Sequence, residues 1–198
     1  MTFITELDVV NKCLASMGEV PINSISNSTN PIVTNARAAF KTAVIAEQGI
    51  GWWFNKEVVT LEPQADGFYY CPTDTLSLVT QSDVNPAWLA LRGKKLYNLG
   101  TASYHIGTNR LPVHLIRLIP FDDVPFNAQR LIQASAVATF QRDYDGDELK
   151  QRAADEDYEE AYSLCMADHT RSVKANMLAH GGTGVARTRV RYPTGRWR

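Results

Sequence analysis

Hydrophobic positions in the N-terminal part of the chain recur with the period of a helix. Thr5 followed by Asp8 has the residue types of a capping box and predicts a helix over 5–17. Its apolar stripe consists of Leu7, Val10, Leu14 and Met17. A second helix is predicted to begin at Asn30 and Pro31, a favoured pair of cap and first helical residue, and to end near Gly49. Its apolar positions are Ala36, Phe40, Ala43 and Val44.

The pattern changes between residues 52 and 119. Short runs rich in β-branched and aromatic residues alternate there with Gly, Pro, Asn and Asp, which is typical of strands separated by turns. The Arg92-Gly93 pair lies where a tight hairpin turn is expected. We therefore predict an antiparallel sheet of about four to six strands, the usual range for a sheet.

Helical periodicity returns near residue 120. Asp122 and Asp123 are predicted to cap a helix that has Pro125 in its first turn. A long helix is then predicted from Asp147 to Met177. Its apolar stripe consists of Ala154, Tyr158, Ala161 and Cys165.

This order of elements predicts an α+β fold. Helices at both ends of the chain form a bundle over 1–51 and 120–178, and an antiparallel β-sheet module over 52–119 is inserted between them. Residues 179–198 form a basic C-terminal arm, which we expect to be extended.

The charge of the chain is divided unevenly. The formal net charge is only -1, from 20 basic and 21 acidic residues. Five of the arginines lie beyond Met177, where there is no acid, so the rest of the chain has 15 basic residues and a net charge near -6. The body should repel DNA, while the arm should attract an acidic surface.

The closing sequence TGVARTRVRYPTGRWR is therefore predicted to dock on a partner. Its alternating arginines share one face in an extended backbone. The candidate docking residues are Arg187, Arg189, Arg191, Tyr192, Arg196, Trp197 and Arg198. The acidic helix supplies a candidate lumen or subunit interface with Asp155, Glu156, Glu159 and Glu160.

Motifs for catalysis, metals or cofactors are not apparent. The run RDYDGDELK lacks the Gly and Glu positions of a calcium loop, so it favours an acidic helix start beside a Gly turn. Cys13, Cys71 and Cys165 have no metal-site or disulfide spacing and are expected to be buried thiols. The block GWWFN is expected to anchor a core or interface rather than to stack nucleobases. We predict no catalytic residue, no metal and no cofactor.

Several stretches together resemble one family. They are VVNKCLASMGEVPINSI, TNARAAF, GWWFNKEVVTLEP, LIRLIPFDDVP and YSLCMADH with NML. In order and spacing they are similar to the tail tubular protein A family of autographivirus-type short-tailed phages. The most specific pieces are Leu14 to Glu19 and the Gly51-Trp52-x-Phe54-Asn55 segment.

The resemblance implies a structural protein of the virion tail that is assembled in the host cytoplasm. Members of the family form a ring, usually of twelve subunits, between the portal protein and the nozzle formed by tail tubular protein B, near the tail fibres. The ring is part of the conduit for DNA ejection, and we expect DNA to pass through it without specific binding. The family offers no catalytic motif.

Two alternatives stay open at this point. A tail-associated hydrolase of cell wall or polysaccharide needs a cleft with two carboxyl groups in opposed environments. A DNA-binding module would use the basic arm, and its affinity would fall with rising salt.

Overall fold

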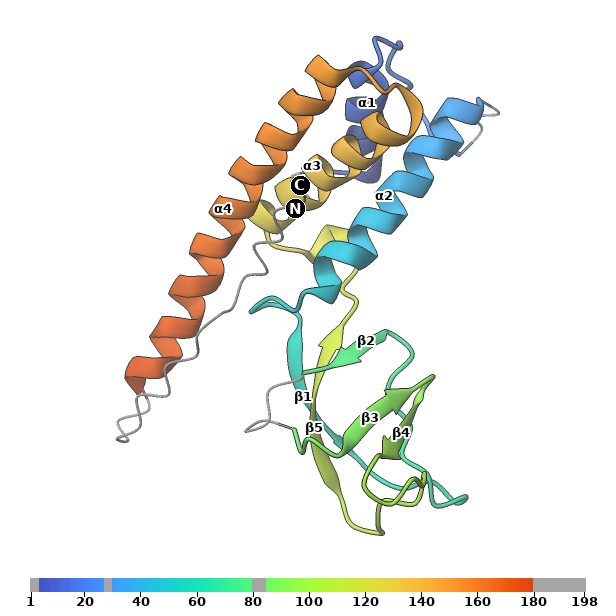
Figure 1. The fold of residues 1–198 in the computed structure, drawn as a ribbon, viewed down its shortest axis with the longest axis vertical. Coiled ribbons are helices and arrows are strands. Elements are labelled where there is room, and N and C mark those ends of the chain that lie inside the picture. Colours follow the sequence, from blue (N-terminus) through green and yellow to red (C-terminus); the bar gives the residue numbers. More distant parts are fainter. Residues whose placement is uncertain (1–3, 27–29, 80–84, 180–198) are drawn as a thin grey trace, which may run out of the picture.

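The computed structural model describes residues 4–26, 30–79 and 85–179. Four α-helices lie at one end of this part of the molecule and the β-strands at the other (Figure 1). The predicted α+β fold, with a β module inserted between N- and C-terminal helices, is confirmed. The predicted arm lies outside the described residues, except for Ala179 at the end of the last helix.

The first two helices begin at the caps that the sequence predicts. Helix α1 spans Glu6–Ser16, and the Thr5 hydroxyl accepts a hydrogen bond from the Asp8 amide at 3.2 Å while the Thr5 amide donates to Asp8. Helix α2 spans Pro31–Gly49, and the Asn30 side chain accepts from the Ile32 amide at 2.9 Å. Side chains thus satisfy amides that have no partner inside the helix.

The prediction for the start of the third helix is wrong. Asp122 and Asp123 belong to a 3₁₀ turn, η1 (Phe121–Asp123), and α3 (Phe126–Tyr144) starts after Pro125 without a side-chain cap. Proline disfavours helical geometry in the residue before it, so Val124 is extended and separates the aspartates from α3.

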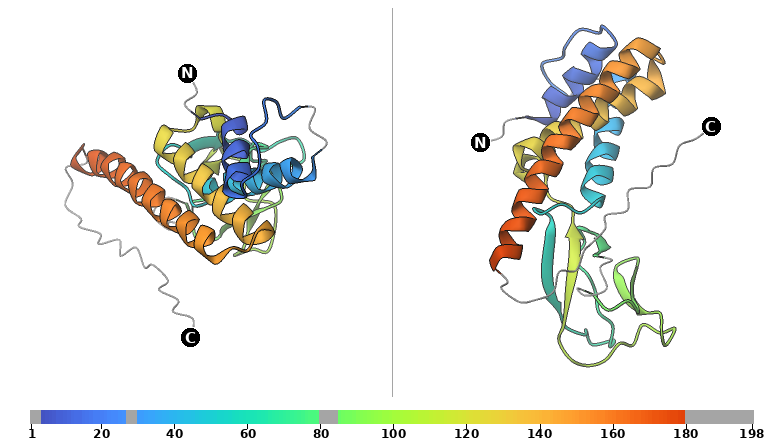
Figure 2. Two further views of the ribbon diagram at one scale, coloured as in Figure 1. Left: turned by 90° about the horizontal axis from the view of Figure 1, so that it is seen from above. Right: turned by 60° about the vertical axis from the view of Figure 1, so that its left-hand side comes forward.

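The last helix, α4, spans Glu148–Ala179. Asp147 accepts hydrogen bonds from the amides of Leu149 and Lys150, and Gly146 turns the chain before it with a φ of +70°. This agrees with the predicted acidic helix start beside a Gly turn. Helix α4 runs along the outside of the helical layer (α1 to α4) and extends beyond α3, as both views of Figure 2 show.

Helix α3 is the centre of the helical layer and contacts α1, α2 and α4. Its Leu131, Ile132 and Phe140 are buried in the core. In α1 the buried stripe consists of Val9, Val10, Cys13 and Leu14, whereas the predicted Leu7 and Met17 are only half-buried. The face that α1 turns to α3 is therefore rotated relative to the predicted stripe.

The described strands form two small sheets rather than the single sheet that we predicted. Strand β5 (Leu111–Arg117) lies between β1 (Lys56–Leu61) and β2 (Thr75–Leu78) in an antiparallel sheet, and β3 (Leu89–Arg92) pairs with β4 (Lys95–Asn98) in a separate hairpin. The hairpin contributes Leu89 and Leu96 to the same core as Val113 and Leu115 of β5. It packs against the sheet instead of extending it, which is what divides the strands.

The hairpin turn lies one residue later than predicted. Arg92 pairs with Lys95, so the two turn residues are Gly93 and Lys94. Gly93 has a φ of +62°, a conformation that tight hairpin turns require and that glycine adopts without steric cost.

A buried polar joint connects the helical layer to the β module (β1 to β5). The Gln48 side chain exchanges two hydrogen bonds with the backbone of Ile119, at 2.7 and 2.9 Å. The Asn55 side chain accepts from the Trp52 amide and donates to the carbonyls of Gln48 and Arg117. Two amide side chains thus fasten the end of α2 to the end of β5.

Candidate interaction surfaces

The four acidic residues that we predicted as one interface lie on three faces of α4. Glu156 and Glu159 point outward and are exposed. Asp155 lines a cavity beside α2, whereas Glu160 lines one beside α1. Successive helical residues are rotated by about 100°, so residues five apart lie far round the helix from each other. The structure does not bring the four together.

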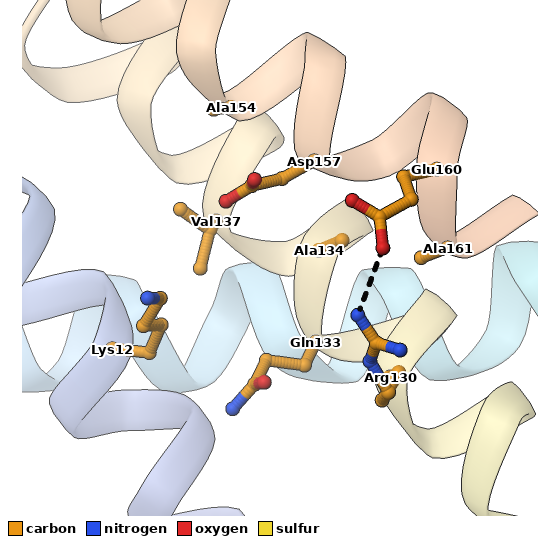
Figure 3. Close-up of a pocket in the computed structure, with 9 residues that line it drawn as sticks. All are labelled: Lys12, Arg130, Gln133, Ala134, Val137, Ala154, Asp157, Glu160 and Ala161. Carbon is orange, nitrogen blue, oxygen red and sulfur yellow. Dashed lines mark hydrogen bonds and ion pairs between the residues drawn. The ribbon is translucent and has the colours of Figure 1, made fainter.

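The cavity on the α1 side contains charges of both signs. It measures about 160 Å³, and its Arg130 and Glu160 form an ion pair at 3.5 Å (Figure 3). Lys12 and Asp157 line it from opposite helices. Gln133 and small apolar side chains, among them Ala134 and Ala161, form the rest of the wall. Because two basic and two acidic groups balance, this cavity has little net charge to attract an ionic ligand.

The cavity on the other side of α4 is different because it contains a buried acid. It measures about 220 Å³, lies between α2, α3 and α4, and is lined by Glu47, Ser135, Ala138, Thr139, Arg142, Gln151, Asp155 and Tyr158. Glu47 is only 5% exposed. Glu47 Oε2 and Gln151 Oε1 are both buried and have no hydrogen-bond partner among the described residues.

Burial sets the protonation behaviour of this second cavity. It raises the pKa of Glu47, and hydrogen bonding to the hydroxyls of Ser135 and Tyr158 opposes this only in part. Burial, with the charge of Glu47 beside it, also raises the pKa of Tyr158 to about 12. Glu47 was not among the residues predicted from the sequence, although it lies four positions after Ala43 on the apolar stripe of α2. A carboxyl group at a core-facing helical position was the available signal.

An apolar groove runs along the C-terminal half of α2. It measures about 390 Å³ and is lined by Phe40, Lys41, Val44, Ile45, Leu118, Ile119, Pro120 and Phe121. Ile45 of α2 is 53% exposed, and Ile50, the residue that follows the helix, is 51% exposed. An apolar groove with an exposed isoleucine is typical of surfaces that contact another protein.

The aromatic block GWWFN anchors the core, as the sequence predicts. Trp52 is 2% exposed, and its indole donates to the Glu47 carbonyl at 2.8 Å. Its ring packs edge-on against Tyr162 and His169 of α4. Because Trp52 is buried on all sides, it cannot stack a nucleobase.

The three cysteines are buried and unpaired, as expected. Burial raises the pKa values of Cys13 and Cys165 to about 12 and that of Cys71 to about 11, so these thiols stay protonated at neutral pH. In the described parts of the chain, we find no group of three or more His, Cys, Asp or Glu side chains placed to hold a metal ion. Nor is any described helix long and apolar enough to cross a membrane.

Comparison with known proteins decides the family. The sequence profile described as tail tubular protein matches residues 7–175. The chain belongs to the tail tubular protein family. Tail tubular protein A of Klebsiella phage KP34 is 26% identical over 168 residues, which cover 84% of this chain and 88% of that protein. The resemblance read from the sequence is confirmed.

Membership of the tail tubular protein family makes this chain a structural protein of the phage virion tail. The match includes the helical layer and the β module, and it ends before the basic arm. The predicted docking residues, from Arg187 to Arg198, lie outside both the matched and the described residues.

Proposed function

We propose that this tail tubular protein forms an adaptor ring of twelve subunits between the capsid portal and the tail nozzle. The observation that carries the proposal is the two-part architecture. A helical layer and a β module with separate cores are joined end to end by Gln48 and Asn55. One subunit thereby offers two different ends for two different neighbours. We place the helices towards the ring and portal and the β module towards the nozzle and fibres.

A closed ring needs two unlike surfaces on each subunit, because each copy contacts the next in a head-to-tail manner. The apolar groove beside Ile45 supplies one surface of suitable chemistry. The acidic side of α4 supplies a second, of a quite different kind. The groove needs an apolar surface of the next subunit as its complement, whereas the acidic side of α4 is suited to a basic segment such as the arm.

The conduit role rests on charge. A wall rich in basic groups would hold DNA through release of counterions and would slow ejection. The exposed carboxylates of Glu156 and Glu159 would instead repel the phosphates if they face the lumen. A reconstruction of the ring that places Glu156 and Glu159 on the outer wall would contradict this assignment.

The basic arm is proposed to dock on a neighbouring subunit or on the portal. Replacing the five tail arginines with glutamine should weaken assembly and leave the melting temperature of the monomer unchanged. Native mass measurement of the protein alone and with portal tests both the ring and the arm. If the protein assembles with neither itself nor the portal, the adaptor proposal fails.

The salt dependence of DNA binding tests the alternative use of the arm. A DNA-binding module would bind duplex DNA with an affinity that falls steeply as salt rises and disappears in the same glutamine variant. We expect this protein to bind duplex DNA no more tightly than proteins bind DNA non-specifically.

A hydrolase is the second candidate, because one cavity contains two carboxyl groups in opposed environments. Glu47 is buried with a raised pKa, while Asp155 is exposed on the same cavity. Peptidoglycan and capsular polysaccharide are the substrates to assay. Hydrolysis that is abolished in both Glu47→Gln and Asp155→Asn would establish this function, and absence of hydrolysis by the unaltered protein would dismiss it.

A further inference from the structure

We propose that the cavity between α2, α3 and α4 receives an arginine side chain from the basic arm of a second copy of this chain. This inference rests on the proposed ring and names the surface on which the arm docks. The cavity is the one beside Glu47 and Asp155, and we call it the arginine cavity.

The arginine cavity is rich in hydrogen-bond acceptors. The Asp155 carboxylate lies on its exposed side, and Glu47 Oε2 and Gln151 Oε1 are buried beside it without a partner among the described residues. Unpartnered buried acceptors are costly, so a donor that reaches them is favoured. Glu47 is 95% shielded from solvent, as its 5% exposure shows, and its charge would act there with little screening.

The chemistry of the cavity favours a guanidinium group. A guanidinium has a positive charge and five N–H donors in one plane, which suits several acceptors at different positions. The charges facing the cavity are Glu47 from α2, Arg142 from α3 and Asp155 from α4. Arg142 is already paired with Asp143 at 3.0 Å, so the acids outweigh the free positive charge. A cavity of about 220 Å³ also has room for a planar group, since one water takes up roughly 30 Å³.

The surface next to the cavity suits an extended chain. A second depression of about 430 Å³ shares Arg142, Gln151 and Asp155 with the arginine cavity and continues to Glu148 and Arg152 near the start of α4. An extended arm that places one arginine in the cavity would therefore lie along a surface with a further exposed acid, Glu148, and a further exposed base, Arg152.

The length of the arm allows either copy to donate the arginine, and the proposed ring, which brings a neighbouring arm close, favours a second copy. Asp155 and Ala179 are 24 residues apart on α4, which at roughly 1.5 Å per residue is about 36 Å. An extended chain gains at most about 3.6 Å per residue, so the arm needs on the order of ten residues, fully straight, merely to return to its own cavity. Because 19 residues follow Ala179, the distal arginines of the same chain also reach that far, and the mixing of two variants described below distinguishes the two donors.

A peptide titration tests the cavity directly. The probe is a fluorescent peptide of residues 181–198, and the receptor is the full chain with its five tail arginines replaced by glutamine, which removes competition from its own arm. We expect Asp155→Asn in the receptor to weaken binding at least about tenfold. Asp157→Asn is the matched control: it makes the same change on the same helix, but its side chain lines the cavity on the α1 side. It should leave binding unchanged.

Two further variants sharpen the titration. Glu47→Gln should weaken binding as well, and its melting curve checks that the receptor stays folded. A peptide with lysine at all five positions keeps the charge and loses the planar donors, so it should bind several-fold more weakly. If Asp155→Asn and Asp157→Asn have equal effects, or if the lysine peptide binds as tightly as the arginine peptide, the arginine cavity is not the docking site.

Mixing two variants of the full chain identifies the donor. One variant has Asp155→Asn and Glu47→Gln with an intact arm, and the other has the glutamine arm with an intact cavity. If a second copy donates the arginine, the two variants associate when mixed, although neither associates alone. If the two variants do not associate when mixed, although the peptide still binds the cavity, the arginine does not come from a second copy. If the unaltered protein forms rings but Asp155→Asn does not change the affinity for the peptide, the adaptor proposal is retained and the arginine cavity is rejected as the docking site.

Discussion

The helical layer and the β module bury their apolar side chains in two separate cores of different composition. Among the described residues, the helical core contains 20 buried members and the β core eight. Alanines such as Ala36, Ala136 and Ala161 are frequent in the first, while leucines predominate in the second. Small side chains let helices approach closely, so the helical layer depends on a few large residues that fill the remaining space. The β module depends instead on a hairpin packed over a sheet.

The largest effect is expected in the helical core. Phe140→Ala removes a fully buried ring from α3 and should lower the free energy of unfolding by about 3–5 kcal/mol. Leu96→Ala in the β core is the matched comparison and should cost about 2–5 kcal/mol. Urea denaturation measures both. A cost under about 1 kcal/mol for Phe140→Ala would show that the helices move together and fill the space left by the ring. That result would contradict a tightly packed helical layer.

A second, smaller effect tests how the two cores are coupled. Asn55→Ala leaves up to three backbone groups at the joint without partners and should cost about 3 kcal/mol at about 1 kcal/mol each. Hydrogen exchange followed by segment should then show the β module opening before the helical layer. Asn23→Ala changes an exposed asparagine and is the control. Simultaneous opening of both parts in Asn55→Ala would argue against the joint as the main coupling.

The capping box of α1 gives a prediction of about 1 kcal/mol. Thr5→Ala removes the hydroxyl that accepts from the Asp8 amide, which should lower stability by about that amount. Thermal denaturation at neutral pH measures it. Because α1 belongs to the helical layer, exchange protection in the β module should not change, and a loss of protection there would contradict the separation of the two cores.

The last prediction concerns how the stability of the helical layer depends on pH. Because burial raises the pKa of Glu47, the folded protein binds this proton more tightly than the unfolded chain. Protonation of Glu47 therefore stabilises the folded state. This stabilisation is complete below the ordinary pKa of 4.5 and is lost as pH rises through the raised pKa of the folded protein. Glu47→Gln should melt higher than the unaltered protein at pH 8, with a difference that shrinks towards pH 4. A difference that grows as pH falls would contradict the sign.

Local signals account for what was predicted correctly. The caps at Thr5, Asn30 and Asp147 depend on residues within three positions of each other, so the sequence contains all that they need. The predicted cap at Asp122 and Asp123 failed for an equally local reason, since Pro125 keeps Val124 extended. The turn at Gly93 was misplaced by one residue because strand register, not turn composition alone, fixes its position.

Long-range contacts account for the rest of the fold. Strand β5 pairs with β1 across 50 to 60 positions of the chain, from Leu61 with Leu111 to Lys56 with Ile116. The composition of β1 and β5 does not identify them as partners. It also does not predict that the β3–β4 hairpin packs over the sheet. The polar joint was missed for the same reason, because Gln48 and Ile119 are 71 residues apart.

By itself the sequence determined the helices, the strands, the family and the division of charge between an acidic body and a basic arm, because periodicity, caps and composition are properties of the chain. The tertiary structure decided which face of α4 each acid occupies and which helix it meets. It separated Asp155 from Glu160, and it placed Asp155 on the cavity where Glu47 is buried. Glu47 is an ordinary helical glutamate until α3 and α4 remove the water around it, and only that burial gives the cavity its unpartnered acceptors.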